Sequence, residues 1–165
     1  MIKKVFEEIF KPQPSKEIRG IAIGVPVDEV IALEGTEYYE ETEITPHFQY
    51  YFTTTAFPET EYEMVYYYDK NRLVSSISLF LAYNPLQSDM DKATFEALAK
   101  ETLNYFDQKY GSHKLIKEKT EAGQLLEYSW KQETPKPGIE VFLMVYYEFL
   151  NGNERVLKVV IRAGN

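Results

Sequence analysis

The stretch that decides the fold is YEMVYYYDKNRLVSSISLFL, residues 62–81. Apolar and polar side chains alternate along most of its two runs, with the period of a strand that buries one face. The segment Asp69-Lys70-Asn71 between the runs has the composition of a tight turn. The stretch therefore predicts two antiparallel strands, and the side chains expected to face the core are Tyr62, Met64, Tyr66, Tyr68, Leu73, Ile77, Leu79 and Leu81.

The same period of two recurs on both sides of this hairpin. Weaker strands are expected near residues 37–43 and 114–120, and Asn151-Gly152-Asn153 reads as the turn before the last strand. The sequence thus predicts an antiparallel sheet of about eight strands. The further apolar sets are Phe48, Tyr50 and Phe52, then Leu126, Tyr128 and Trp130, then Val141, Leu143, Val145 and Tyr147, and finally Leu157, Val159 and Ile161.

Three segments have helical spacing instead. Residues 1–11 form an amphipathic pattern that Pro12 ends, and residues 26–34 start at Pro26 and stop before Gly35. The residues of this second helix expected to face inward are Val27, Val30, Ile31 and Leu33. The longest helix is capped at Ser88 or Asp91, ends at Gly111, and has an apolar stripe at Phe95, Leu98, Ala99, Thr102, Leu103, Phe106 and Tyr110.

The two halves of the chain repeat one order of elements. A helix, a glycine, a weak strand and three stronger strands follow one another in residues 19–83 and again in residues 89–163. This order predicts a duplicated α-β-β-β-β unit within one compact domain, residues 1–165, although chance meanders of similar length could imitate it. The expected class is α+β, with helices on one face of a single antiparallel sheet or of two four-stranded halves side by side.

Charge and composition exclude several classes of partner. The 26 acidic and 18 basic residues leave a net charge of -8, which repels nucleic acid backbones and anionic lipid surfaces. The chain has no cysteine, so disulfides, thiolate catalysis and Cys-ligated zinc are excluded. Glu7 and Glu8 interrupt any secretory signal in the first ten residues. We expect a cytoplasmic protein, exported only if this sequence lacks a precursor signal, with no nucleic acid or membrane partner.

Candidate groups for catalysis or metal binding are few. His47 and His113 are the two histidines, and each is interpreted as an exposed residue beside a turn rather than as a catalytic base. The carboxylates of residues 37–43 lack the spacing of a calcium loop, and are interpreted as a solvated strand edge. Gly20 and Gly24 fit no nucleotide-binding motif. The sequence therefore predicts no catalytic residue, no metal and no cofactor, and favours a protein that is not an enzyme.

The segment Ile21-Ala22-Ile23-Gly24-Val25-Pro26-Val27-Asp28-Glu29-Val30, closing at Gly35, resembles the helix opening of one known family. That family is typified by the β-lactamase inhibitor protein and by small outer-membrane assembly lipoproteins. The resemblance implies a helix followed by a meander, duplicated in the inhibitor, with a sheet that binds protein and no enzyme activity. The chain departs from the family in lacking an export signal, a lipid-attachment cysteine and a disulfide pair.

A set of large side chains is left on the sheet face that points away from the helices. We refer to this side of the sheet as the open face, and its candidate partner-binding residues are Tyr51, Val65, Tyr67, Phe80, Phe142, Met144 and Tyr146. Aromatic and Met side chains are enriched in the cores of protein interfaces. The leading hypothesis is a protein-binding module of the inhibitor, immunity or chaperone-like kind, and homodimerisation or the helix over residues 1–11 could cover the same face. The alternative is a small-ligand-binding protein or enzyme with a cavity between the sheet and the long helix.

Overall fold

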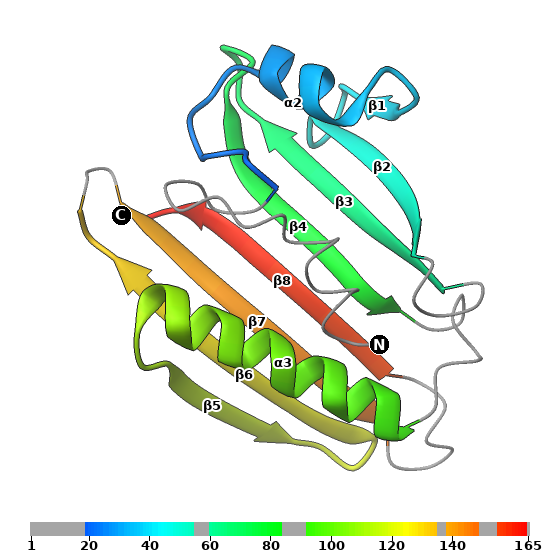
Figure 1. Ribbon diagram of the computed structural model, residues 1–165, viewed down its shortest axis with the longest axis vertical. Coiled ribbons are helices and arrows are strands. Elements are labelled where there is room, and N and C mark those ends of the chain that lie inside the picture. Colours follow the sequence, from blue (N-terminus) through cyan, green and yellow to red (C-terminus); the bar gives the residue numbers. More distant parts are fainter. Residues whose placement is uncertain (1–18, 55–59, 84–91, 135–137, 149–154, 165) are drawn as a thin grey trace.

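The computed structural model describes residues 19–54, 60–83, 92–134, 138–148 and 155–164 (Figure 1). The expected helix over residues 1–11, the candidate caps Ser88 and Asp91, and the expected turn at residues 151–153 lie outside the described residues. The elements follow in the order α2 (Val27–Glu34), β1 (Tyr39–Glu41), β2 (His47–Thr54), β3 (Thr60–Tyr68), β4 (Val74–Tyr83), α3 (Lys92–Tyr110), β5 (Lys114–Lys119), β6 (Gly123–Gln132), β7 (Ile139–Glu148) and β8 (Arg155–Ala163).

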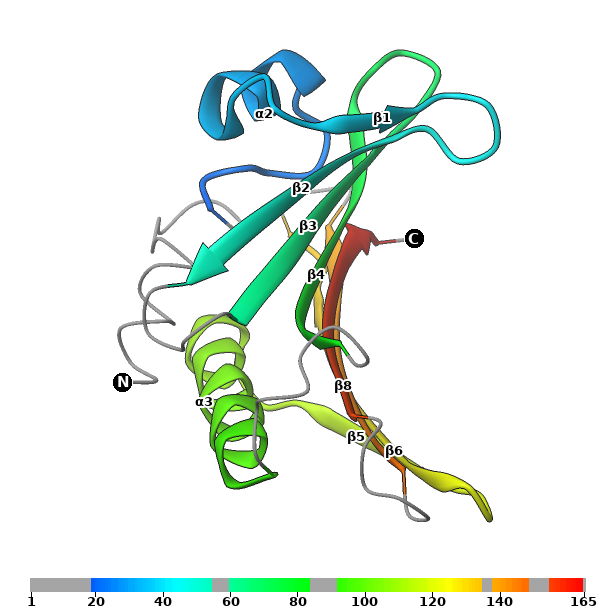
Figure 2. The same ribbon diagram turned by 90° about the vertical axis from the view of Figure 1, so that its right-hand side faces the viewer.

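The strands form one 8-stranded antiparallel sheet in the order β1-β2-β3-β4-β8-β7-β6-β5. The prediction of an α+β fold with a single antiparallel sheet is therefore confirmed. The last strands of the two halves, β4 and β8, pair at the centre, and the first strands, β1 and β5, form the two edges. Figure 2 shows that the sheet is twisted and that α2 and α3 lie on the same side of it.

The core lies between the helices and every second side chain of the strands. The register joins these side chains into continuous rows, because residues directly opposite on neighbouring strands point to the same face. The row that crosses from β2 to β6 is fully buried and consists of Phe48, Tyr66, Ile77, Ile161, Val141 and Trp130.

Two of the predicted core positions are wrong. Leu73 precedes β4 and is only partly buried; the register shifts between Tyr67 and Tyr68, so that Val74 pairs with Tyr68 and is buried instead. A β-bulge of this kind inserts one residue and reverses the alternation beyond it. Leu33 is exposed, because the inward position at the end of α2 belongs to Glu34.

The long helix packs against β6 and β7 as its apolar stripe predicts (Figure 1). Phe95, Leu98, Thr102 and Phe106 are its buried residues. The Phe95 ring meets the Tyr147 ring edge-on with centroids 5.2 Å apart, and the Phe106 ring lies 5.4 Å from Trp130. The helix ends before Gly111, whose φ of 93° lies in the left-handed region that favours glycine. Neither described helix is long and apolar enough to cross a membrane.

Candidate functional site on the open face of the sheet

Strand pairing places all seven candidate residues on the open face. One row across the sheet contains Tyr51, Glu63, Phe80, Lys158 and Met144, each opposite the next. The adjacent rows contain the other candidates, with Tyr67 opposite Ser76, Val65 opposite Ser78, Phe142 opposite Val160 and Tyr146 opposite Val156. Both described helices cover the other side of the sheet (Figure 2). The candidates thus come from four strands, β2, β3, β4 and β7. Strand β8 lies between β4 and β7, and its residues complete the rows, so that all of these side chains form one surface.

The seven side chains differ in how much of their surface is available. Tyr51 is 58% exposed, whereas Val65 is only 4% exposed. Val65 is a short side chain between the flanking strands, so it supports the surface but offers little area for contact. Tyr67, Phe80, Phe142, Met144 and Tyr146 are partly buried. The accessible part of the set is therefore formed by aromatic rings and one methionine.

Two cations of the central strand β8 lie over aromatic rings of this face. The Lys158 ammonium is 4.7 Å from the centroid of Phe80, and the Arg162 guanidinium is 4.8 Å from the centroid of Phe142. Arg162 also donates to the Glu140 carboxylate at 2.9 Å. Cations in this position are attracted by the negative face of the ring, and they cover part of its apolar area. The centre of the open face is therefore amphipathic rather than purely apolar.

The β2–β3 side of the face carries a small polar group. The Gln49 side-chain amide donates to Tyr51 Oη at 2.6 Å and to Glu63 Oε1 at 2.5 Å. Burial raises the pKa of Glu63 above its ordinary value, although the Gln49 hydrogen bond and the neighbouring His47 and Lys158 act in the opposite direction. These contacts hold the exposed Tyr51 ring at a defined position on the surface.

The strand register adds residues that the sequence patterns did not identify. Tyr39, His47 and Ile116 also lie on the open face, because Tyr39 pairs with Gln49, His47 with Tyr67 and Ile116 with Glu127. The His47 ring is 5.4 Å from the Tyr67 ring, and its Nδ1 donates to the Thr45 carbonyl at 2.7 Å. Tyr39 and Ile116 belong to the weak edge strands, whose register only the pairing could supply.

The acidic segment at the β1 edge makes local hydrogen bonds. The Glu41 carboxylate accepts from the backbone N–H groups of Ile44 and Thr45 at 3.0 and 3.1 Å. These two hydrogen bonds, together with a further one from the Glu43 N–H, lower the pKa of Glu41. Glu40 accepts from Tyr68 Oη at 2.7 Å. These two carboxylates thus stabilise the β1–β2 loop and the sheet edge, a more specific role than a solvated edge.

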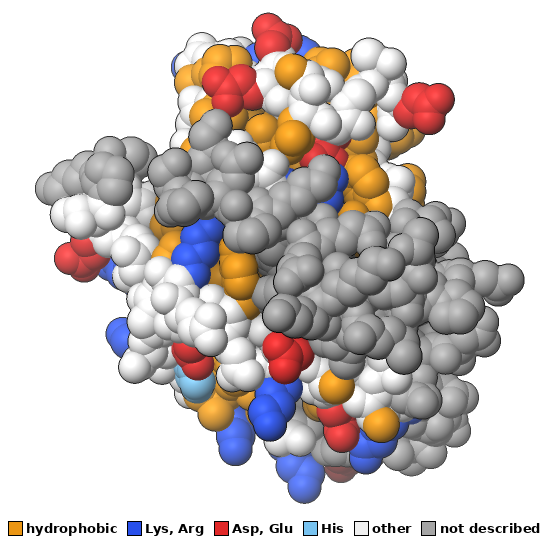
Figure 3. Space-filling view, in the orientation of Figure 1, with side chains coloured by type: hydrophobic (Ala, Val, Ile, Leu, Met, Phe, Trp, Pro, Cys, Tyr) orange, Lys and Arg blue, Asp and Glu red, His pale blue; other side chains and the backbone are white. Residues whose placement is uncertain are grey.

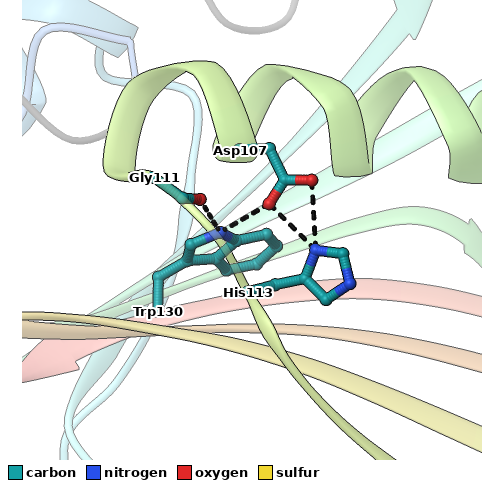
Figure 4. A network of polar contacts seen from close by, with 4 residues as sticks. All are labelled: Asp107, Gly111, His113 and Trp130. Atoms are coloured by element: carbon teal, nitrogen blue, oxygen red, sulfur yellow. Dashed lines mark hydrogen bonds and ion pairs between the residues drawn. The ribbon is translucent and has the colours of Figure 1, made fainter.

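On the helix side, His113 belongs to a polar network at the end of α3 (Figure 4). Its Nδ1 lies 2.9 Å from Asp107 Oδ1, and Trp130 Nε1 donates to the same oxygen at 3.1 Å and to the Gly111 carbonyl at 3.0 Å. His113 lies beside a turn as expected, but its side chain is only 30% exposed and contacts Asp107, so its interpretation as an exposed residue is corrected. Asp107 in the last helical turn was the available signal, because a carboxylate there needs a partner to offset the helix dipole. The network ties the helix end to β6.

A second polar cluster lies inside the helix side of the first half. Arg19 Nε donates to Glu34 Oε1 at 2.9 Å, and its Nη1 donates to Tyr62 Oη at 3.2 Å. The side chains of Arg19 and Glu34 are 4% and 0% exposed. Burial disfavours the charged guanidinium, but the hydrogen bond and charge of Glu34 outweigh burial and raise the pKa of Arg19 above its ordinary value. The pair thus neutralises itself within the core.

The helix side of the sheet also carries other charged side chains. Among the described residues, no group of three or more His, Cys, Asp or Glu side chains gathers where it could hold a metal ion. Several basic side chains are visible at the end of this side that holds α3 and β5 (Figure 3). The open face is therefore the surface on which a functional hypothesis can best be built.

In comparisons with known proteins, no family model, curated protein or solved structure matches this chain. The class that the fold defines is an α+β protein with one antiparallel sheet and two described helices on one side of it. The resemblance carried by residues 21–35 stays a prediction.

Proposed function

We propose that this protein is a non-catalytic protein-binding module that holds its partner on the open face of the sheet. The observation that carries the proposal is the gathering of Tyr51, Tyr67, Phe80, Phe142 and Tyr146 on the side that neither described helix covers. Tyrosine and phenylalanine supply large contact areas in interface cores, and the tyrosine hydroxyl adds a hydrogen-bonding group.

The dimensions of the face fit a protein partner. Strands lie about 4.8 Å apart and residues about 3.3 Å apart along a strand, so eight strands with about eight residues each span roughly 34 Å by 26 Å. This area of roughly 900 Å² is close to the about 800 Å² that each partner contributes to a standard protein interface. A small ligand would occupy only a fraction of it.

The electrostatic character of the face favours a partner with mixed chemistry. Lys158 and Arg162 stand at the centre, while Glu63 and Glu127 lie in the same row as Lys158. Both signs of charge are therefore available at short range, between aromatic rings. Such a surface selects a partner through the positions of complementary charges rather than through net charge.

The alternative of a cavity between the sheet and α3 has less support. Phe95, Leu98 and Phe106 fill the described part of that interface and meet the rings of Tyr147 and Trp130. The roles that fit a sheet with one face free of the described helices are those of an inhibitor, an immunity factor or a chaperone. The same order of elements in both halves, and the resemblance of residues 21–35, support a duplicated module of this kind.

The proposal is tested by quantitative affinity capture from the cell of origin with three versions of the chain. Tyr67→Thr, Phe142→Thr and Tyr146→Thr are combined in one variant, because threonine keeps a high strand propensity while it removes the rings. Interface aromatics commonly cost about 2 kcal/mol or more each when truncated, so a partner captured by the wild type should be lost completely.

A matched control replaces three exposed residues of α3, Lys100, Glu101 and Asn104, with Ala. This control should capture the same partner as the wild type, and denaturation curves should show that both variants remain folded. Equal capture by the folded open-face variant and the wild type would place the binding surface elsewhere and refute the proposal.

A further inference from the structure

The edge strand β5 has features that the proposed function does not use. Among the described strands it pairs on one side only, with β6, and all six of its residues are exposed. Leu115 and Ile116 are 42% and 53% exposed, although both are large apolar side chains. The opposite edge, β1, has only three residues. An exposed edge of this length presents unpaired backbone groups to which another strand can add.

The hairpin geometry decides which backbone groups of β5 point outward. The Thr120 N–H donates to the Gly123 carbonyl at 2.9 Å, so the two residues form a hydrogen-bonded pair at the start of the β5–β6 ladder. Bonded and non-bonded pairs alternate along an antiparallel ladder. Continuing the register, Ile116 bonds to β6, whereas the backbone groups of Leu115 and Lys117 point away from the sheet.

The side chains of β5 on the open-face side are self-complementary. They are Lys114, Ile116 and Glu118, because these residues pair with Ser129, Glu127 and Leu125 of β6. Read in the opposite direction, the same strand offers an acid, an isoleucine and a base. Opposite charges and apolar pairs directly across two antiparallel strands are stabilising.

We propose that a second copy of this chain adds to β5 as an antiparallel strand, with a two-fold axis through Ile116. Leu115 of each copy exchanges backbone hydrogen bonds with Lys117 of the other, which uses the groups that point outward. Ile116 faces its counterpart, and Lys114 of each copy forms an ion pair with Glu118 of the other. The interface is isologous, as expected for a symmetric dimer.

The alternation of backbone groups allows only a few other two-fold registers, and these are worse. An axis through Leu115 pairs Lys114 with Ile116 and loses both ion pairs. An axis through Lys117 places two lysines opposite each other. The register centred on Ile116 is therefore selected by both backbone and side chains.

The dimer joins two sheets edge to edge and leaves the open faces of both copies free. A single strand pair buries less than the about 1,200 Å² of stable interfaces, so the association is weak and depends on protein concentration. Sedimentation velocity of the full chain, from about 10 µM to about 1 mM, should show a monomer–dimer equilibrium that weakens with added salt.

Charge reversal tests the register. The variants Lys114→Glu and Glu118→Lys each place like charges opposite each other twice, and each should weaken self-association about tenfold or more. An equimolar mixture of the two single variants should associate with each other, because every facing pair is then opposite in sign. The double variant should dimerise as the wild type does. Lys100→Glu on α3 is the control, since it makes the same change in charge at an exposed site outside β5.

Several results would overturn the proposal. They are a wild type that stays monomeric up to the highest concentration, single variants that dimerise normally, and a mixture or double variant that fails to restore association. In the first case the lysines of β5 protect the edge instead. The Tyr67, Phe142 and Tyr146 variant should keep this dimer; loss of self-association in that variant would move the contact to the open face.

Discussion

The two halves of the sheet receive the same order of elements but are covered in different ways. In the first half, α2 has 8 residues and buries Val27 and Val30. In the second half, α3 has 19 residues and buries Phe95, Leu98, Thr102 and Phe106. At 1.5 Å per residue the two helices are about 12 Å and about 28 Å long. The shorter helix therefore leaves more of its half to be covered by other groups.

The side chains of the strands compensate for this difference. The core side of the first half is rich in rings, with Tyr50 and Tyr66 at 5.9 Å and Phe52 and Tyr62 at 5.1 Å between centroids. Arg19 lies 4.5 Å above the Phe52 ring. The strands of the second half carry mostly aliphatic core residues, which are Val141, Leu143, Val145, Leu157, Val159 and Ile161. The first half thus relies on rings and a buried ion pair, and the second on apolar packing under a long helix.

Both halves nevertheless fix the end of their helix in a similar way. Tyr50 Oη donates to the Gly35 carbonyl at 3.1 Å, and Trp130 Nε1 donates to the Gly111 carbonyl at 3.0 Å. Each carbonyl belongs to the glycine that follows the helix, and each donor comes from a strand of the same half. The halves therefore share a hydrogen bond from a strand side chain to the end of the helix, and differ in the side chains that fill the core beside it.

The largest loss of stability is expected from breaking the buried ion pair of the first half. Glu34→Ala leaves the Arg19 guanidinium in the core without its carboxylate, which should lower the free energy of unfolding by about 3–5 kcal/mol. Chemical denaturation measures this loss. Glu133→Ala is the control, because its pair with Lys131 is exposed and should contribute less than about 1 kcal/mol. Equal losses in the two variants would mean that the first half does not depend on its ion pair.

A cavity under the long helix should lower the free energy of unfolding by slightly less. Leu98→Ala removes a buried side chain from the packing of the second half, and the expected loss of unfolding free energy is about 2–5 kcal/mol. Denaturant titration of the variant measures it, with the exposed α3 substitution Lys100→Ala as the control. A loss within about half a kcal/mol, the usual range for surface positions, would contradict the assignment of α3 as the cover of this half.

Sequence patterns predicted the second half better than the first. The stripe of α3 and the alternation of β6–β8 directly encode apolar packing, so both could be identified from periodicity. The polar contacts could not be identified from the sequence, because Arg19–Glu34 and Asp107–His113 join side chains whose proximity depends on the fold. The bulge beside Tyr68 also leaves no periodic signal, which is why Leu73 was placed in the core in error.

The candidate site was likewise predictable only in part. Alternation alone assigned Tyr51, Phe80 and Phe142 to one face, since period two is a property of each strand separately. Which residues of different strands stand side by side, such as Lys158 beside Phe80, depends on the register and on the central β4–β8 pairing. The placement of the edge residues Tyr39 and Ile116 on the open face also depends on the register.

A smaller effect is expected where a tyrosine docks the end of α2. Tyr50→Phe removes the hydrogen bond to Gly35 and should cost about 1 kcal/mol at neutral pH. Burial, together with the charges of Glu34 and Tyr38, raises the pKa of Tyr50 to about 12. Between the unfolded value of about 10 and this folded value, the folded chain holds more protons than the unfolded chain, so the contribution of Tyr50 to stability falls as pH rises.

Unfolding curves at pH 7, 10 and about 12 test this expectation. The wild type should lose more stability than Tyr50→Phe across the alkaline range, so that the difference between the two narrows. The other tyrosines are present in both proteins and cancel in the comparison. A constant difference at every pH would show that Tyr50 does not titrate differently in the folded state.

The smallest effect is expected one strand away, at Tyr66. Its hydroxyl oxygen is buried and makes no hydrogen bond of normal geometry among the described residues, although Arg19 lies near enough for a weak polar contact; Glu34 Oε2 has no such bond either. Burial and the charge of Glu34 raise the pKa of Tyr66 well above its usual range, while Arg19 acts in the opposite direction. Because a weak contact offsets little of the desolvation of a buried hydroxyl, Tyr66→Phe should leave the free energy of unfolding unchanged or raise it by up to about 1 kcal/mol. Tyr50→Phe on the neighbouring strand is the matched control, since both changes remove one oxygen from a buried ring of the same core. A loss at Tyr66 as large as that at Tyr50 would contradict this expectation, and would show that the hydroxyl makes a full hydrogen bond in the folded chain, either to Arg19 or through a buried water to Glu34.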